Sequence, residues 1–266
     1  MIKLITVAIV LFAIYLFLIA PKNEKKMEKY KKIYYAHRGL HNSERAENSM
    51  SAFKAAVEHG YGIELDIRLS KDGNLVVFHD DTLDRVCGRE GKVIDFTADE
   101  LADFKLNGTE DGIPLFSDVL ALVDGKAPLL VEIKEDSGDS AVSKASCEIL
   151  KNYKGDFIIE SFNPISLRNV KKNAPEFIRG ILSRQYYDYE EPKKLIYFVL
   201  ESLILNFLCR PAFIAYNHNH AKSPVLRFVR AFFGVPTIAW TVRSAKEEEE
   251  ARKNGFDGII FENYLP

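Results

Sequence analysis

Short runs rich in β-branched and other apolar residues alternate with helix-like stretches along most of this 266-residue chain. The runs that favour strands cover residues 33–36, 63–67, 129–133, 157–161, 178–182, 213–216, 237–242 and 258–261. Helical patterns lie between several of them, at residues 49–59, 140–152, 164–173 and 245–254. Eight strand–helix units in succession predict an α/β fold, a (β/α)8 TIM barrel. We expect this barrel domain to cover residues 33–266.

Two stretches interrupt the alternation. Residues 75–78 form a ninth apolar run, and the turn-favouring residues 71–74 precede it, so a hairpin extension of the second strand is expected. Residues 80–125 contain several turn signals and only a short helix-like segment. We interpret residues 80–125 as a small insertion at the mouth of the barrel, where loops carry function.

The N-terminal residues have a different character. Residues 4–20 carry no charged side chain and are apolar all round. A run of this length is near the lower limit for crossing a bilayer and too long for most signal-peptide cores. No small-x-small cleavage pattern follows it. We therefore expect residues 1–21 to form one transmembrane helix, an uncleaved anchor, rather than a cleaved signal or a buried helix.

Positive charge is concentrated next to this run. Residues 1–32 hold seven Lys and two Glu, a net +5 that leaves −7 for the rest of the chain. Residues 22–32 are expected to form a basic juxtamembrane linker, and the positive-inside rule then places the barrel on the cytoplasmic side of the cell membrane. The overall charge of −2 gives no reason to expect nucleic acid as a partner. Three scattered cysteines predict neither a disulfide framework nor a zinc site.

Two carboxylates share one face of the second predicted strand. Glu64 and Asp66 are two residues apart, so their side chains point the same way. The inward face of a barrel strand is normally apolar, and two carboxylates there repel each other unless a cation lies between them. Glu132, at the end of the next barrel strand, is a candidate third ligand. Oxygen ligands alone favour Ca²⁺ or Mg²⁺ over zinc.

Further polar residues follow strands of the predicted barrel. His37 and Arg38 come after the first strand, His79 after the hairpin, and Lys134 after Glu132. The catalytic groups of TIM barrels lie where strands end. Arg and Lys suit a phosphate group, and two histidines with pKa values near neutrality suit paired acid and base catalysis. The combination predicts metal-assisted cleavage of a phosphodiester.

The sequence resembles the glycerophosphodiester phosphodiesterase family at these positions. The matching strings are His37-Arg38-Gly39, Glu47-Asn48-Ser49 and Glu64-Leu65-Asp66, then residues 79–85, Ile113-Pro114-Leu115, Glu132-Ile133-Lys134, Ser161-Phe162, Trp240-Thr241-Val242 and Asp257-Gly258. They occur in the family's order over residues 33–262 and are specific as a set.

The resemblance implies a TIM barrel that hydrolyses glycerophosphodiesters to an alcohol and sn-glycerol 3-phosphate. It implies that a divalent cation is held by Glu64, Asp66 and Glu132, and that phosphate is bound by Arg38 and Lys134. It also implies His37 and His79 as the acid/base pair, with Glu47 supporting the metal or His37. A substrate hydroxyl in this family can attack phosphorus first, which gives a cyclic phosphate that water then opens.

The chain departs from the family's pattern in three places. Val86-Cys87 stands for Thr-Thr, Ser49 for Thr, and residues 261–264 for Thr-Asp-x-Pro. None is a predicted ligand position, so we expect these differences to affect substrate shape more than chemistry.

Other features remain open. Trp240 is a candidate contact for the carbon face of a glycerol group, with core packing as the alternative. His218 and His220 have a zinc-hydrolase spacing, although in barrels of that class the pair belongs to the first strand. The apolar stretches 195–208 and 225–233 favour burial against the barrel, and the alternative is a membrane-facing collar.

The predicted partners are a small-molecule glycerophosphodiester or lysolipid and, through the anchor, membrane lipid. One alternative function is a lysophospholipase D that acts on membrane lysolipids with the same residues. Another is a non-catalytic membrane barrel that only binds phosphodiesters. The head group, the native metal and the oligomeric state are not predicted by the sequence.

Overall fold

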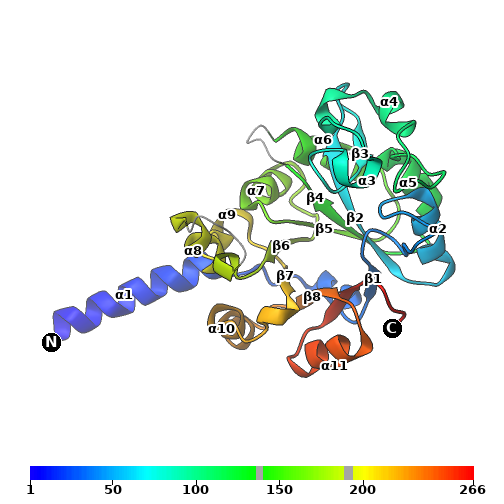
Figure 1. Ribbon diagram of the computed structural model, residues 1–266. Helices are drawn as coiled ribbons and strands as arrows, with labels where there is room; N and C mark the ends of the chain where they lie inside the picture. Colours follow the sequence, from blue (N-terminus) through cyan, green and yellow to red (C-terminus); the bar gives the residue numbers. More distant parts are fainter. Residues whose placement is uncertain (136–139, 189–193) are drawn as a thin grey trace.

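The computed structural model describes residues 1–135, 140–188 and 194–266. In this part of the chain, eight parallel strands follow the order β1-β9-β8-β7-β6-β5-β4-β2, and pairing of β1 with β2 closes the sheet into a barrel (Figure 1). The expected (β/α)8 barrel is thus confirmed. Its strands are β1 (Tyr34–Ala36), β2 (Gly62–Leu69), β4 (Leu129–Ile133), β5 (Phe157–Ser161), β6 (Arg179–Ser183), β7 (Phe213–Asn217), β8 (Thr237–Val242) and β9 (Gly258–Phe261).

Helices cover the outside of this barrel. They are α2 (Met50–Glu58), α5 (Phe116–Val123), α6 (Ala141–Leu150), α7 (Pro164–Asn173), α8 (Leu195–Glu201), α9 (Asn206–Cys209), α10 (Pro224–Phe233) and α11 (Ala245–Lys253). Capping residues set several starts: the side chain of Asn163 accepts a hydrogen bond from the Ile165 amide, with Pro164 in the first turn of α7.

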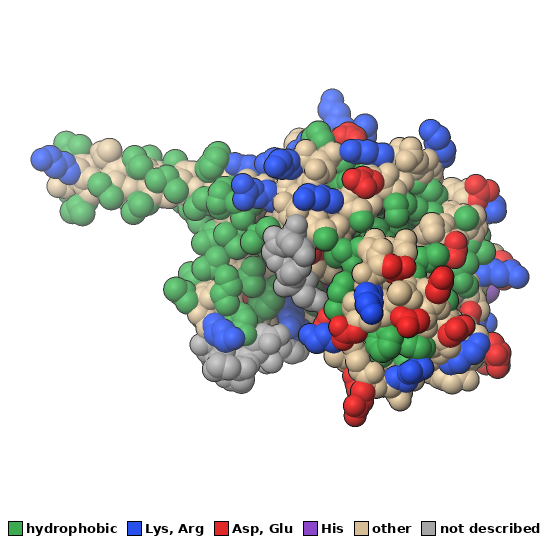
Figure 2. Space-filling view, turned by 90° about the horizontal axis from the view of Figure 1, so that it is seen from above, with side chains coloured by type: hydrophobic (Ala, Val, Ile, Leu, Met, Phe, Trp, Pro, Cys, Tyr) green, Lys and Arg blue, Asp and Glu red, His purple; other side chains and the backbone are tan. Residues whose placement is uncertain are grey.

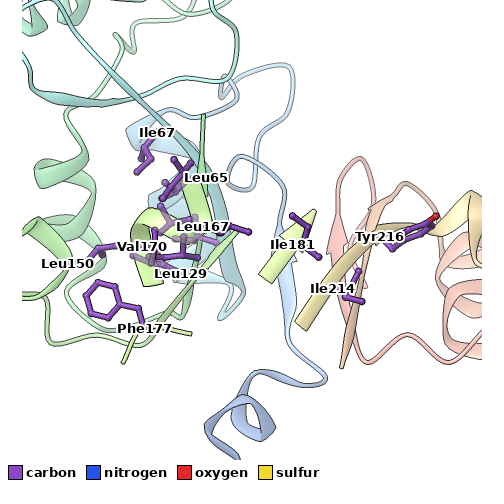
Figure 3. Packing of buried hydrophobic residues seen from close by; sticks show 14 of the residues in the cluster. Leu65, Ile67, Leu129, Leu150, Leu167, Val170, Phe177, Ile181, Ile214 and Tyr216 are labelled. Carbon is purple, nitrogen blue, oxygen red and sulfur yellow. The ribbon is translucent and has the colours of Figure 1, made fainter. Parts of the chain in front are cut away.

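The layer between strands and helices is the main apolar core. Leu65 and Leu129 point outward from β2 and β4 and pack against Leu150, Leu167 and Val170 of α6 and α7 (Figure 3). All five side chains are fully or almost fully buried. Burial of such side chains contributes about 1.5–3 kcal/mol each and holds the strands in register.

The predicted hairpin is confirmed, because β3 (Leu75–Val77) pairs antiparallel with β2. The region expected as an insertion, residues 80–125, contains α3 (Asp84–Cys87), the 3₁₀ turn η2 (Val93–Asp95), α4 (Ala98–Ala102) and α5. The first three elements share a separate apolar cluster with Phe104 and Ile113. Helix α5 differs, because Phe116 and Val123 belong to the main core and α5 packs against α2 as a barrel helix.

The bottom of the barrel is closed by residues from the expected linker, 22–32. A 3₁₀ turn, η1 (Lys25–Tyr30), buries Met27 and Tyr30 among the inward-facing side chains of the strands. The Tyr30 hydroxyl donates a hydrogen bond to the Phe157 carbonyl at 3.1 Å. Gly62 leaves room there for the Tyr35 ring, which would lie 2.8 Å from a Cβ at position 62. This segment therefore completes the packing of the barrel interior as well as joining it to the N-terminal helix.

The N-terminal helix α1 (Ile2–Ile19) projects from the side of the barrel (Figure 1). It is long and apolar enough to cross a membrane, by length and composition, and only 6% of it is buried. Its C-terminal end is fixed to the barrel, because Ile19 is buried and its carbonyl accepts a hydrogen bond from Asn206 Nδ2 at 3.2 Å.

Candidate active site

Three carboxylates meet at the carboxyl ends of β2 and β4. Glu64 and Asp66 point inward from β2, and Glu132 is the residue of β4 in register with Asp66. One oxygen of each group lies within 4.8 Å of the others, and all three side chains are buried. The alternation of β2 causes this arrangement, since Leu65 takes the outward position between the two acids.

Positive groups surround the carboxylates. Lys134 Nζ lies 2.7 Å from Glu132 Oε1 and 3.2 Å from Asp66 Oδ1. Arg38 Nε is 3.5 Å from Asp66 Oδ2, and Asn48 Nδ2 donates to the same oxygen at 2.9 Å. Burial alone would raise the pKa of Asp66, but these neighbours and the nearby His79 lower it well below its usual value.

The other two acids are compensated less well. Burial, then repulsion by Asp66 and Glu132, raises the pKa of Glu64 well above its usual value. Burial raises the pKa of Glu132 to about 7, with the charge of Lys134 opposing the shift. Three buried carboxylate groups that repel one another form an oxygen donor set for a hard divalent cation. The residues present therefore fit such an ion.

Two histidines face the same cavity, which has a volume of about 200 Å³. His37 follows β1, and its Nδ1 donates to Glu262 Oε2 at 2.5 Å. His79 follows β3, and its Nδ1 donates to Asp80 Oδ1 at 2.6 Å. Burial lowers the pKa of both histidines, although the paired carboxylates oppose the shift. In the neutral form each ring then keeps the lone pair of Nε2 free to accept a proton.

Glu47 links Arg38 to the second histidine. It accepts hydrogen bonds from Arg38 Nη1 at 2.7 Å and from both terminal nitrogens of Arg85. Arg85 Nε donates in turn to Asp80, the partner of His79. Glu47 therefore contacts two arginines, whereas support of the metal or of His37 was expected. The backbone contributes too, since Arg38 has a positive φ of 55° and its amide donates to Glu64 Oε2 at 2.8 Å.

The structure adds two acidic residues that sequence reasoning did not select. Glu160 on β5 is in register with Glu132 and lines the cavity, and its Oε2 is buried without a hydrogen-bond partner among the described residues. Burial and the nearby acids raise its pKa well above the usual value. Glu262 lies in the 261–264 stretch that was expected to have little effect on the chemistry, yet it contacts His37. Both acids occupy strand ends, the position that singled out Glu132.

The remaining candidates lie at different places. Trp240 lines the cavity and packs edge-on against Phe162, with ring centroids 5.5 Å apart. His218 Nε2 donates a hydrogen bond to the Thr241 carbonyl at 3.2 Å, and His218 belongs to no cluster of possible metal ligands among the described residues. The predicted zinc-type spacing at His218 and His220 thus has no metal-like geometry there.

Comparison with known proteins agrees with this geometry. The sequence model of the Glycerophosphoryl diester phosphodiesterase family matches residues 37–264. A glycerophosphodiester phosphodiesterase of Caldanaerobacter subterraneus is 34% identical over 244 residues, which cover 86% of this chain and 93% of that protein. A lysophospholipase D of Rattus norvegicus is 30% identical over 149 residues, 51% of this chain and 46% of its own length.

A solved structure supports the same fold. The Oleispira antarctica phosphodiesterase, in complex with the product sn-glycerol-3-phosphate, superimposes with a TM-score of 0.72 at 22% identity and covers 89% of this chain and 95% of its own. The matched range spans the positions of all seven candidate site residues: His37, Arg38, Glu64, Asp66, His79, Glu132 and Lys134. This chain therefore belongs to the glycerophosphoryl diester phosphodiesterase family.

Proposed function

We propose that this protein is a divalent-metal-dependent hydrolase that converts glycerophosphodiesters to an alcohol and sn-glycerol 3-phosphate. One observation carries the proposal: two histidines, buried carboxylates and two fixed cations line a single cavity. The glycerophosphodiester phosphodiesterase from Caldanaerobacter and the product bound by the Oleispira protein support the substrate class.

Glu64, Asp66 and Glu132 are the proposed ligands of the cation, Ca²⁺ or Mg²⁺. When bound, the ion supplies positive charge that stabilises the charge developing on the phosphoryl oxygens. The candidate ligands support this proposal: they are three buried carboxylates that repel one another, and all their donor atoms are oxygens.

Arg38 and Lys134 are the proposed phosphate-binding residues. Both border the cavity beside the carboxylates. Without substrate their charges are directed at Asp66 and Glu132. Arg38 can donate two parallel hydrogen bonds to phosphate, whereas Lys134 acts as a compact positive charge. Glu47 keeps the Arg38 guanidinium at the rim of the cavity.

His37 and His79 are the proposed acid/base pair. One neutral imidazole accepts the proton of the attacking hydroxyl through Nε2, and the other, in its protonated form, donates a proton to the leaving alcohol oxygen. The attacking group is water or a hydroxyl of the substrate; in the second case a cyclic phosphate forms and water opens it. Glu262 and Asp80 fix the ring orientations from the Nδ1 side.

Trp240 is the proposed contact for the carbon face of the glycerol group. Trp240 is one of the residues that line the cavity, and its ring packs edge-on against Phe162. An indole face offers an apolar surface next to a polar site, which suits a polyol with exposed C–H groups.

We also propose that α1 anchors the enzyme in the cell membrane as a single span. The charge asymmetry at residues 1–32 favours a cytoplasmic barrel. A reporter fused after Pro266 tests this side: activity of a reporter that works only in the cytoplasm is expected, and an extracellular signal would reverse the assignment.

A second candidate function is a lysophospholipase D. The exposed apolar helix favours it, because such a helix holds the barrel at the surface where lysolipids reside. The deciding assay compares glycerophosphocholine with lysophosphatidylcholine, with Ca²⁺, Mg²⁺ or Mn²⁺ present and after chelation. Metal-dependent turnover of glycerophosphocholine supports the first function, and strong preference for the acylated substrate supports the second. Absence of turnover on every substrate would favour the non-catalytic barrel.

A further inference from the structure

An exposed apolar face lies on the barrel next to α1. We call it the α8–α10 face and define it by Leu195, Ile196 and Phe198 of α8 and Phe232 of α10. These side chains are 78%, 47%, 59% and 54% exposed. Helix α8 buries none of its residues. Figure 2 shows that the apolar surface of α1 continues onto the neighbouring part of the barrel without a break.

Helix α1 lies against the same elements. The ring of Phe228 on α10 has its centroid 6.4 Å from that of Phe12 and 6.3 Å from that of Tyr15. On the other side, Arg210 at the end of α9 donates to the Phe17 carbonyl at 2.7 Å. The part of α1 from Phe12 to Ile19, nearly half of the helix, therefore runs along the barrel, with α10 on one side and α9 on the other (Figure 1).

The contact at Phe12 sets a depth. Ile19, the last residue of the helix, lies seven positions after Phe12, which corresponds to about 10 Å along a helix axis. If α1 crosses a bilayer, Ile19 is near one interface, and the part of α10 that touches Phe12 is about 10 Å inside it. If that part of α10 lay in water, the half of α1 that runs beside it would also lie outside the hydrocarbon region.

The composition of α10 agrees with this depth. Leu226 and Val229 pack into the barrel, whereas Phe228 and Phe232 stack on the outer side with centroids 5.5 Å apart. The guanidinium of Arg230 is turned to the backbone carbonyls of Asn254 and Gly255. Aromatic rings in a row beside α1 suit the boundary between lipid head groups and acyl chains.

We infer that the α8–α10 face is itself immersed in the lipid bilayer, so that the barrel enters the membrane surface beside its anchor. The inference rests on the proposed membrane span of α1. It has a consequence for substrates. Helix α8 contacts the 3₁₀ turn η3 (Tyr186–Asp188), which follows the carboxyl end of β6, and the Tyr187 amide donates to Glu201 at 2.8 Å. The immersed face thus adjoins the mouth of the barrel, where a lipid-like diester can enter from the bilayer.

Fluorescence quenching by lipids with brominated acyl chains tests the inference on the full chain. Trp240→Phe removes the single native tryptophan. In that background, Phe198→Trp and Phe232→Trp place a probe on the α8–α10 face, and Val10→Trp places one in α1. Ile94→Trp is the control, because Ile94 is 49% exposed but lies in η2, away from α1.

In phosphatidylcholine vesicles we expect loss of emission for Phe198→Trp and Phe232→Trp with bromine between the head-group end and the middle of the acyl chain. We expect loss for Val10→Trp with bromine near the bilayer centre, and none for Ile94→Trp. If Val10→Trp is quenched but Phe198→Trp and Phe232→Trp behave like Ile94→Trp, the immersion of the face is rejected and the membrane span of α1 stands. No quenching at Val10→Trp would reject the membrane span as well. Unquenched face probes in a protein that forms dimers in nanodiscs would assign the face to a second copy of the chain.

Discussion

The two ends of the barrel interior are built from the same strands and have opposite chemistry. At the bottom, the inward-facing residues are apolar: Tyr35, Leu130, Ile158, Ile238 and Ile260. Two residues further along each strand, the same face carries His37, Glu132, Glu160, Trp240 and Glu262. The two layers are about 7 Å apart, since two residues of a strand rise by that distance.

The difference separates residues that stabilise the barrel, at its bottom, from candidate catalytic residues two positions further along the same strands. The bottom layer is closed by Met27 and Tyr30, which pack with its apolar side chains. In the mouth layer, acids such as Glu64 and Glu160 are buried beside other acids, and burial and this repulsion raise their pKa values. Substitutions at the mouth should therefore change turnover with little loss of stability, and substitutions at the bottom should do the reverse.

The largest effect is expected at the two histidines. His37→Ala and His79→Ala each remove a proton-transfer group, which contributes about 10²–10⁴-fold to rate. We expect both variants to lose that factor in kcat at unchanged thermal stability, measured by initial rates on glycerophosphocholine and by thermal unfolding. The matched control is His59→Ala, because His59 is exposed and its Nδ1 is paired with the Ala55 carbonyl of its own helix. Near-normal turnover in either site variant would refute the pair.

At the bottom, Tyr30→Ala is expected to act on stability. The ring is 3% exposed, and deletion of a buried aromatic ring costs about 3–5 kcal/mol in free energy of unfolding. Urea denaturation in detergent measures this loss, while kcat of the protein that remains folded should stay near the wild-type value. Tyr30→Phe keeps the ring and loses only the hydrogen bond to Phe157, so it should cost about 1 kcal/mol. A fall in kcat without a fall in stability would contradict the division of the barrel.

The role of Tyr30 also marks a limit of sequence analysis. Strands and strand-end residues were predictable, because alternation and turn signals act over a few neighbouring residues. Residues 22–32 show mainly charge, and nothing local indicates that Met27 and Tyr30 face a barrel whose strands begin further along. Closure of the barrel by this segment depends on contacts with residues more than a hundred positions away, such as Phe157.

A smaller effect is expected at Glu262, the partner of His37. Loss of the carboxylate partner behind a metal-binding histidine typically costs about 10–100-fold, and we expect a loss of at least that size in kcat/KM for Glu262→Ala. The carboxylate raises the pKa of His37 against the larger effect of burial. Its removal should therefore move the limb of the pH–rate profile that belongs to His37 to lower pH. Glu262→Gln keeps an acceptor without the charge, so it should show the pH shift with a smaller loss of rate.

Glu262 was missed because one glutamate after a strand has no specific pattern, and its stretch differs from the family's Thr-Asp-x-Pro. Its contact with His37 joins the two ends of the sequence, 225 residues apart. The metal-type carboxylates were easier to predict, since two of them share one strand with the spacing of a pleat. Local sequence patterns thus identify residues that share one strand, whereas contacts between strands, such as His37 with Glu262, become visible only in the folded barrel.

The effect on stability expected at Glu64 is smaller than that of Tyr30→Ala and has the opposite sign. Glu64 is buried, and burial followed by repulsion from Asp66 and Glu132 raises its pKa, so a charge there destabilises the metal-free fold at neutral pH. We expect Glu64→Gln to raise the metal-free free energy of unfolding by about 0.5–2 kcal/mol while turnover is lost. The gain should vanish near pH 4, because an unfolded glutamate is then protonated too. Thermal unfolding with and without Ca²⁺ measures both sides: the cation should stabilise the wild type and leave the variant unchanged. A less stable metal-free variant would mean that the mouth carboxylates support the fold, and the separation of the two layers would then fail.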